Sequence, residues 1–205
     1  MFYFCGKAHA RIAAKTAITC ATVLIGMMLS SCHNAHGTLS SMPVFYTDDA
    51  SVELINIEKN KVSIDAPQHI EGAYGEKTFS MDAWMRMNDS LLNIVLFSGF
   101  GNTVAELKFT SDSLKFESSV MNAEKTKAEY IVADIELCYF DMAVLKPHYE
   151  ASQFSLTETI NGNESKRTLS KGGKEILTIT NNGSTIQLKN ILRNYSYTIT
   201  TGSAQ

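Results

Sequence analysis

The alternation of apolar and polar residues between positions 79 and 88 is the feature that most limits the fold of this chain. One face of an extended strand would carry Phe79, Met81, Ala83, Met85 and Met87. The opposite face would carry Ser80, Asp82, Trp84, Arg86 and Asn88. A period of two residues predicts a β-strand that packs one face on a core and leaves the other in solvent.

Further short segments of this kind follow at the spacing of an antiparallel meander. Turns rich in Asn, Asp and Gly separate them, such as Asn88-Asp89 and Gly172-Gly173. Residues 43–61 are compatible either with a short helix capped by Asp48 or Asp49 or with an edge strand. The strands expected after the first one cover residues 91–97, 104–110, 114–118, 154–160, 165–170, 175–180, 185–189 and 195–201.

The period changes to that of a helix between Lys125 and Leu145. We expect Pro147 to end this helical region. The pattern therefore predicts a mainly β chain with one helical insertion: a single antiparallel sheet long enough to curl, with a helix able to lie across it. The apolar stripe consists of Ala128, Ile131, Val132, Ile135, Cys138, Tyr139 and Met142. Glu129, Asp134, Glu136 and Asp141 lie off this stripe, and the last three are expected to form a solvated face and not a metal site.

The N-terminal segment has the order of a bacterial lipoprotein signal. A basic stretch without acids precedes an apolar run that ends in Leu29-Ser30-Ser31-Cys32. We expect residues 1–31 to be removed, Cys32 to become a diacylated N-terminus, residues 32–42 to be a flexible tether, and residues 43–205 to form one domain. His33 follows the cysteine, and the absence of aspartate there favours the periplasmic face of the outer membrane as the location.

Charge and motif content argue against several classes of function. The segment that follows residue 31 has 15 basic against 21 acidic residues, a net charge of −6, which offers no footprint for nucleic acid. We find no catalytic constellation, metal-ligand spacing or cofactor motif, so we expect a protein without catalysis and without a cofactor. Cys138 would remain as a single thiol and is expected to be a small buried hydrophobe.

The methionines of the first strand are the most informative candidates for a site. Met81, Met85 and Met87 could line an adaptable surface for acyl chains, or they could pack an ordinary core. Phe100, between two glycines at a hairpin tip, could touch a membrane or partner, or it could tuck under the helix. Trp84 points the other way and is either an exposed anchor or covered by the N-terminal segment.

Three blocks of the chain carry a family resemblance. They are residues 92–107 around Gly99 and Gly101, the helical residues 130–145, and residues 186–200. With them the chain resembles a family of bacterial outer-membrane lipoproteins encoded beside fatty-acid-synthase-like genes for aryl polyene pigments, itself similar to the lipoprotein-localisation carrier and receptor proteins. Many relatives carry Trp-Pro where this chain has Phe140-Asp141.

The resemblance implies an unclosed antiparallel β-barrel, or half-barrel, covered by α-helices around an apolar cavity. It implies an outer-membrane lipoprotein that binds an acylated or polyene-type lipid and helps to deliver it. An alternative from another class is a structural or scaffolding envelope lipoprotein with a filled core that docks a protein partner. The implied ligand-binding positions are Phe79, Met81, Met85, Met87, Leu92, Ile94 and Leu96, facing Ile131, Ile135 and Tyr139.

Overall fold

A curved antiparallel sheet dominates the computed structural model, which describes residues 42–121 and 126–202. Ten strands form this sheet in the order β7-β6-β5-β4-β3-β12-β11-β10-β9-β8. β7 and β8 stand at its two edges and do not pair with each other, so the sheet is open. The strands are β3 (Ile64–Tyr74), β4 (Lys77–Met87), β5 (Leu92–Phe97), β6 (Thr103–Phe109), β7 (Leu114–Ser118), β8 (Ser155–Asn161), β9 (Glu164–Lys171), β10 (Lys174–Asn181), β11 (Thr185–Asn190) and β12 (Tyr195–Thr201).

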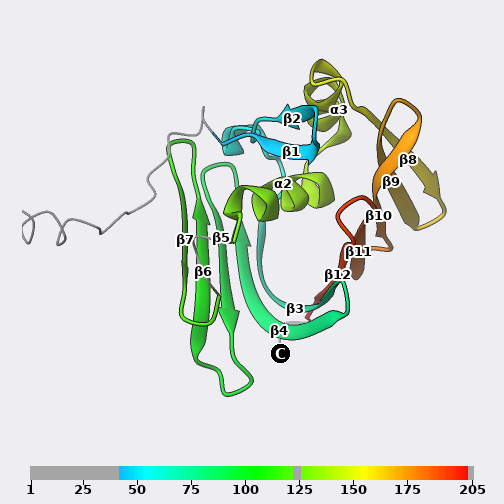
Figure 1. The fold of residues 1–205 in the computed structure, drawn as a ribbon. Helices are drawn as coiled ribbons and strands as arrows, with labels where there is room; N and C mark the ends of the chain where they lie inside the picture. The colour runs from blue at the N-terminus through cyan, green and yellow to red at the C-terminus, as the bar shows by residue number, and fades with distance from the viewer. Residues whose placement is uncertain (1–41, 122–125, 203–205) are drawn as a thin grey trace, which may run out of the picture. The chain divides into compact units, whose positions relative to one another are not determined.

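The predicted strands and their alternation are confirmed. β4 buries Ala83, Met85 and Met87 while the residues between them are exposed, as a period of two requires. β3 and β4 pair along their full length, and Figure 1 shows both bending strongly, so the sheet has a concave and a convex side. The prediction of a mainly β chain with a helical insertion and one open antiparallel sheet is therefore correct.

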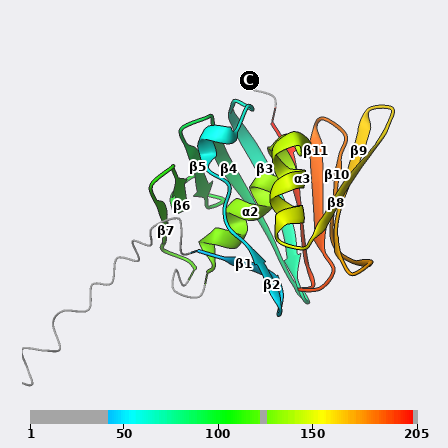
Figure 2. The same ribbon diagram turned by 90° about the horizontal axis from the view of Figure 1, so that it is seen from above.

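The helical insertion contains two helices, α2 (Ala128–Tyr139) and α3 (Met142–Ala151). α2 contacts β7, β10 and β11, and Figures 1 and 2 show it on the concave side of the sheet. Phe140 ends α2 in an extended conformation, and the Asp141 side chain caps α3 by accepting a hydrogen bond from the Ala143 amide at 2.8 Å. The Phe140-Asp141 pair is thus the bend between the helices.

A small hairpin occupies the segment that the sequence left open. β1 (Val44–Thr47) and β2 (Ala50–Val52) pair with each other, and Asp48-Asp49 forms their turn. A short 3₁₀ helix, η2 (Ile57–Lys59), follows after Asn56. Neither alternative is correct as predicted: residues 53–56 form neither a helix nor a strand, and the strands that do occur lie before them and form a two-stranded sheet of their own, not an edge of the large sheet.

Two expectations for the helices are also wrong. Asp134 and Glu136 are 4% and 1% exposed, not part of a solvated face, because other elements cover α2 on the side that carries them. Pro147 does not end the helical region; α3 continues to residue 151. Leu145 and Tyr149 are fully buried on either side of Pro147, and their packing offsets the hydrogen bond that proline cannot make.

Arg167 fixes the end of α2 to the sheet. From β9, its guanidinium donates to the carbonyl oxygens of Leu137 and Phe140 at 2.7 and 2.9 Å. Glu158 on β8 holds the same side chain through a hydrogen bond of 2.8 Å to its Nε. A cation at the last carbonyls of a helix is favourable because it meets groups left without partners there.

Candidate functional site

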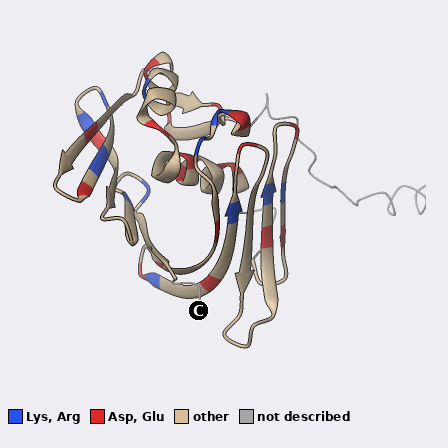
Figure 3. Cartoon of the chain, turned by 180° about the vertical axis from the view of Figure 1, so that it is seen from behind, with Lys and Arg blue, Asp and Glu red and all other residues tan. Residues whose placement is uncertain are grey.

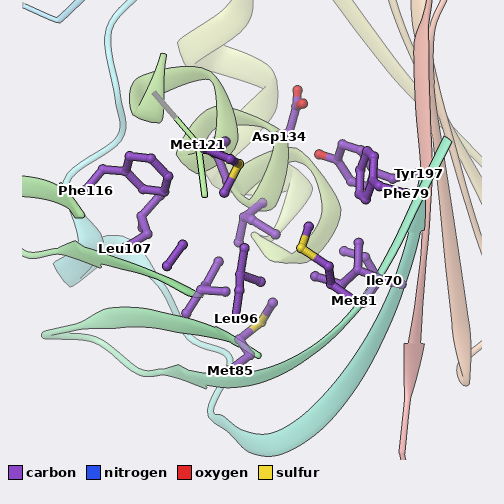
Figure 4. Close-up of a pocket in the computed structure, with 15 residues that line it drawn as sticks. Ile70, Phe79, Met81, Met85, Leu96, Leu107, Phe116, Met121, Asp134 and Tyr197 are labelled. Atoms are coloured by element: carbon purple, nitrogen blue, oxygen red, sulfur yellow. The ribbon is translucent and has the colours of Figure 1, made fainter. Parts of the chain in front are cut away.

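An apolar cavity of about 180 Å³ lies between the concave face of the sheet and α2. Figure 4 shows Met85 and Leu96 on the sheet side, Phe116 and Leu107 toward one end, and Phe79 and Tyr197 toward the other. An apolar cavity of comparable size is known to stay dry and to admit a benzene-sized molecule. The lining residues are Ile70, Phe79, Met81, Met85, Ile94, Leu96, Ala105, Leu107, Phe116, Met121, Ile131, Asp134, Ile135, Tyr197 and Ile199.

Two rows of paired residues build the sheet wall of this cavity. One row crosses four strands, from Met85 on β4 through Ile94 and Leu107 to Phe116 on β7. The other joins Met81 on β4 to Ile70 on β3 and Ile199 on β12. Directly opposed residues in an antiparallel sheet point to the same face, so pairing carries the apolar face of β4 across the whole wall.

Exposure along β4 indicates where the cavity approaches the surface. Phe79 is 41% exposed, Met81 is half-buried and Met85 is fully buried. Phe79 is paired with Gly72 on β3, and a Cβ added at Gly72 would collide with the Phe79 ring. The missing side chain therefore lets this aromatic ring lie over the neighbouring strand at the exposed end of the cavity.

The structure brings together seven of the ten residues proposed from the sequence. Met87 and Leu92 are buried but do not line the cavity; they pair with each other beside the β4–β5 turn and belong to the core. Tyr139 ends α2 away from the cavity, and burial raises the pKa of its hydroxyl, which has no hydrogen-bond partner among the described residues. The seven that do line it are Phe79, Met81, Met85, Ile94, Leu96, Ile131 and Ile135.

Five of the eight lining residues missed by the sequence reasoning fall into two groups. Ile70, Leu107 and Phe116 could have been found, because alternation in β3, β6 and β7 puts them on the same face as the β4 methionines once neighbouring strands are paired. Tyr197 and Ile199 come from β12, which lies beside β3 although more than 120 positions separate them in the sequence. No local pattern marks that neighbour.

Asp134 is the charged residue of the lining, and its environment is unusual. Its Oδ2 accepts a hydrogen bond from the Tyr195 hydroxyl at 2.7 Å, whereas Oδ1 has no partner among the described residues. Burial raises the pKa of Asp134 to about 7, although the Tyr195 and Tyr197 hydroxyls act in the opposite direction. In Figure 4 the carboxyl group points away from Met81 and Met85, so the interior of the cavity remains apolar.

Glu136, two residues further along α2, serves a different contact. Its Oε1 accepts a hydrogen bond from the Ile55 amide at 3.0 Å, which ties the helix to the segment after β2. Burial raises the pKa of this carboxyl, and the Ile55 amide opposes that effect. The two acids therefore join α2 to two different elements.

The convex face of the same strands carries a polar cluster with the order of a Ser-His-Asp arrangement. His69 Nδ1 lies 2.7 Å from Asp82 Oδ1, and its Nε2 lies 3.2 Å from Ser80 Oγ. The His69 and Asp82 side chains are about half and two-thirds exposed. Catalysis by such a set depends on donors aimed at developing charge in a site that excludes water. We therefore assign no chemistry to these solvated groups.

The structure also shows the exposure of two aromatic residues outside the cavity, Phe100 and Trp84. Phe100 is 96% exposed at the tip of the β5–β6 hairpin, which excludes the alternative that it tucks under the helix. Trp84 is partly exposed on the convex face and donates from Nε1 to Asp65 at 2.6 Å. In Figure 3, residues of both charge signs are interspersed along β4, β6, β7 and β9.

Other expectations concern metals, membrane spans and the N-terminus. Within residues 42–121 and 126–202, no group of three His, Cys, Asp or Glu side chains is arranged to hold a metal ion, and no helix is long and apolar enough to cross a membrane. Cys138 is buried, and burial raises the pKa of its thiol, as expected for an unreactive residue. The signal segment 1–31, Cys32 and most of the tether 32–42 lie outside the described residues.

Comparison with known proteins identifies a family but no function. The model of a family described as a protein of unknown function (DUF3261) matches residues 65–203, which include every strand of the large sheet except the first residue of β3, and both helices. None of the curated proteins matches the chain.

Proposed function

The chain belongs to the DUF3261 family, whose description states no function, and we propose that it is a non-catalytic lipoprotein that binds the apolar part of a lipid between its sheet and α2. The observation that carries this proposal is the cavity itself. Apolar side chains from six strands and one helix leave about 180 Å³ unfilled. Native interiors rarely leave a void of this size, because lost packing costs free energy.

The architecture is interpreted as a half-barrel whose concave side is covered by helices. α2 supplies Ile131 and Ile135 to the cavity opposite the sheet, which is the position of a lid. Ligand pockets for small molecules are commonly about 300–1,000 Å³, so the cavity as it stands would hold part of a chain. Movement of α2 or of the methionine side chains would enlarge it, and methionine adapts its shape at low cost.

We also propose a cellular setting for this cavity, from sequence features that lie outside the described residues. The proposed lipid on Cys32 would anchor the protein to the periplasmic face of the outer membrane, and the cargo would be an acylated or polyene-type lipid that is passed to that membrane. Each methylene removed from water contributes about 0.8 kcal/mol, so affinity should rise with chain length. Phe100, an exposed apolar tip, is proposed to touch the membrane or a protein partner.

Native mass spectrometry tests the proposal. The soluble domain of residues 42–205, secreted into the periplasm of its own host, is expected to retain an acyl or polyene mass. Met85→Asp should abolish this mass, because it places a charge against the apolar wall. Ser80→Asp is the matched control, since it adds the same charge to the same strand on the convex face.

Leu107→Phe tests the same point without a charge, because a larger apolar side chain occupies the cavity. It should also remove the ligand mass. A clean protein mass for the unsubstituted domain, repeated after incubation with a lipid extract of the host, would contradict the proposal.

A second candidate is a scaffolding envelope lipoprotein that docks a protein partner. It is favoured by the modest volume of the cavity and by the fully packed half of the sheet around Phe154 and Leu169. Met85→Asp separates the two candidates. In a scaffold it would lower the free energy of unfolding, but there would be no bound lipid to lose.

A further inference from the structure

One hydrogen bond joins α2 to the wall of the cavity. Asp134 lies on α2 between the cavity residues Ile131 and Ile135, and its Oδ2 accepts from Tyr195 on β12. β12 is also the strand that contributes Tyr197 and Ile199 to the cavity. If α2 is the lid, as the proposed function holds, this contact spans the junction between lid and wall.

A negative charge at Asp134 would lie in this junction without compensation. Its second carboxyl oxygen, Oδ1, has no partner among the described residues, and the residue is almost fully buried. The groups that face it come from four elements, and none of them is a cation: Tyr46 on β1, Cys138 on α2, Tyr149 on α3, and Tyr195 and Tyr197 on β12. An ionised carboxylate buried in this way is costly unless it is paired.

We propose that buried Asp134 is a proton-controlled latch: α2 stays packed against β12 while the Asp134 carboxyl is protonated, and this packing loosens when Asp134 ionises, because the buried carboxylate keeps only the hydrogen bond from Tyr195. The carboxyl points away from the cavity interior, so the latch acts on the helix and not on the ligand (Figure 4). This inference rests on the proposed function in taking α2 as the lid, and it adds a means of controlling when the lid opens.

The direction of the effect follows from linkage between proton binding and opening. Burial raises the pKa of Asp134 to about 7 in the closed structure, against a usual value of 3.8 for a solvated aspartate. The closed form therefore binds the proton more tightly than a form in which α2 has lifted. Opening is hardest below about pH 4 and becomes easier as the pH rises toward 7. A ligand should enter and leave faster near neutral pH than in acid.

Hydrogen exchange measured on the full chain, anchored in lipid nanodiscs, tests the latch by a readout that does not depend on ligand binding. The observable is the protection factor of amides 131–138, corrected for the intrinsic pH dependence of exchange. Between pH 5 and pH 7 it should fall at least about tenfold, since one pKa unit corresponds to a tenfold change in the opening equilibrium. Amides of β4 and β5 provide the internal reference.

Two substitutions at the contact give matched comparisons. Asp134→Asn keeps the shape but cannot ionise, so the protection of α2 should lose the part of its pH dependence that Asp134 causes and keep only the part due to Glu136. Tyr195→Phe removes a hydroxyl that lowers the pKa of Asp134 in the closed form, so the fall in protection should continue to higher pH before it levels off. Glu136→Gln serves as the control for the other buried acid of α2, which contacts Ile55, and should preserve the pH dependence that Asp134 causes.

The outcomes separate the latch from the proposed function. The latch would be overturned if the protection of α2 were equal at pH 5 and pH 7. It would also be overturned if that protection changed with pH alike in the unsubstituted chain and in Asp134→Asn. If Asp134→Asn does not fold, an unshifted profile in Tyr195→Phe would do so. A pH-dependent helix in a protein that retains no lipid mass would support the latch and sink the ligand proposal.

Discussion

The two halves of the large sheet follow the same alternating pattern and yet have different interiors. On β8 to β11, Leu156, Leu169, Leu177 and Leu188 are buried in a continuous core. On β3 to β7 and β12, equivalent inward-facing residues border a cavity. No residue of β8 to β11 is among those that line it. Alternation alone therefore predicts which residues face inward, but not whether the space between them is filled.

The difference arises from what packs on each half. The β1–β2 hairpin and α3 bring large aromatic groups to the β8 side: the Tyr46 ring lies 6.0 Å from that of Tyr149 and 5.9 Å from that of Phe154. The Tyr46 and Tyr149 hydroxyls lie 3.3 Å apart within this packing. α2, which also contacts β10 and β11, presents the smaller side chains Ile131 and Ile135 to the cavity. The cavity therefore lies where the covering helix brings no aromatic ring.

The largest expected contrast comes from the same truncation in both halves. Phe154→Ala, in the filled half, should lower the free energy of unfolding by about 3–5 kcal/mol, because it opens a hole in close packing. Phe116→Ala, at the half-buried wall of the cavity, should cost about 1 kcal/mol, since its ring already lacks neighbours on one side. Urea denaturation measures both. Equal costs would mean that the cavity half is packed as tightly as the other.

Stability should also depend on pH through Asp134, the buried acid of α2 beside the cavity. The pKa of Asp134 is raised to about 7, so its contribution is complete below its unfolded pKa near 3.8 and is lost as the pH rises through 7. The free energy of unfolding should fall by about 2–4 kcal/mol between pH 4 and pH 8. Asp49 and Asp65 have lowered pKa values and act in the opposite direction at acid pH, but both are exposed.

Asp134→Asn provides the control for this pH dependence. It should reduce the change between pH 4 and pH 8 measured by urea denaturation by the part that Asp134 causes, leaving the contribution of Glu136, whose pKa burial also raises. A slope that survives unchanged in Asp134→Asn would assign the effect to another group.

Features that depend on residues near one another in the sequence could be predicted, whereas features that depend on distant residues could not. The strands and the cavity face of β4 were predictable, because alternation is local and β4 pairs with neighbours that follow or precede it directly. The burial of Asp134 was not, since Tyr195 lies 61 positions away and a helical wheel places an acid outward by default. Pro147 misled for a similar reason: the burial of Leu145 and Tyr149 depends on tertiary packing.

The cavity itself could be predicted only in part. Its methionines were identified from one strand, but the empty space depends on α2 and β12, which the sequence does not place. Met87 and Leu92 share the apolar faces of β4 and β5 with the cavity residues and differ from them only in lying next to the turn. A pattern of period two is uniform along a strand and cannot show where along it the core ends.

Overpacking by one substitution should distinguish the halves more finely. Leu169→Phe, in the filled half, should lower the free energy of unfolding by about 1–3 kcal/mol, because the larger ring forces its neighbours apart. Leu107→Phe, on the cavity wall, should change it by less than about 1 kcal/mol, because the ring has space to enter. Thermal and urea unfolding give both values. A loss in Leu107→Phe as large as in Leu169→Phe would show that the cavity cannot accept added atoms.

The smallest effects are expected on the convex face, where the comparison between the halves no longer applies. Ser80→Ala and His69→Ala should each change the free energy of unfolding by less than about 0.5 kcal/mol, since exposed polar contacts are largely replaced by water.

The same variants test whether this Ser-His-Asp arrangement has any activity. Hydrolysis of p-nitrophenyl acetate by the unsubstituted protein should equal that by Ser80→Ala, whereas a rate that Ser80→Ala and His69→Ala both abolish would make the convex face an active site. Ligand retention should be unaffected in both variants, because their side chains lie on the face of β3 and β4 that is turned away from Met81 and Met85.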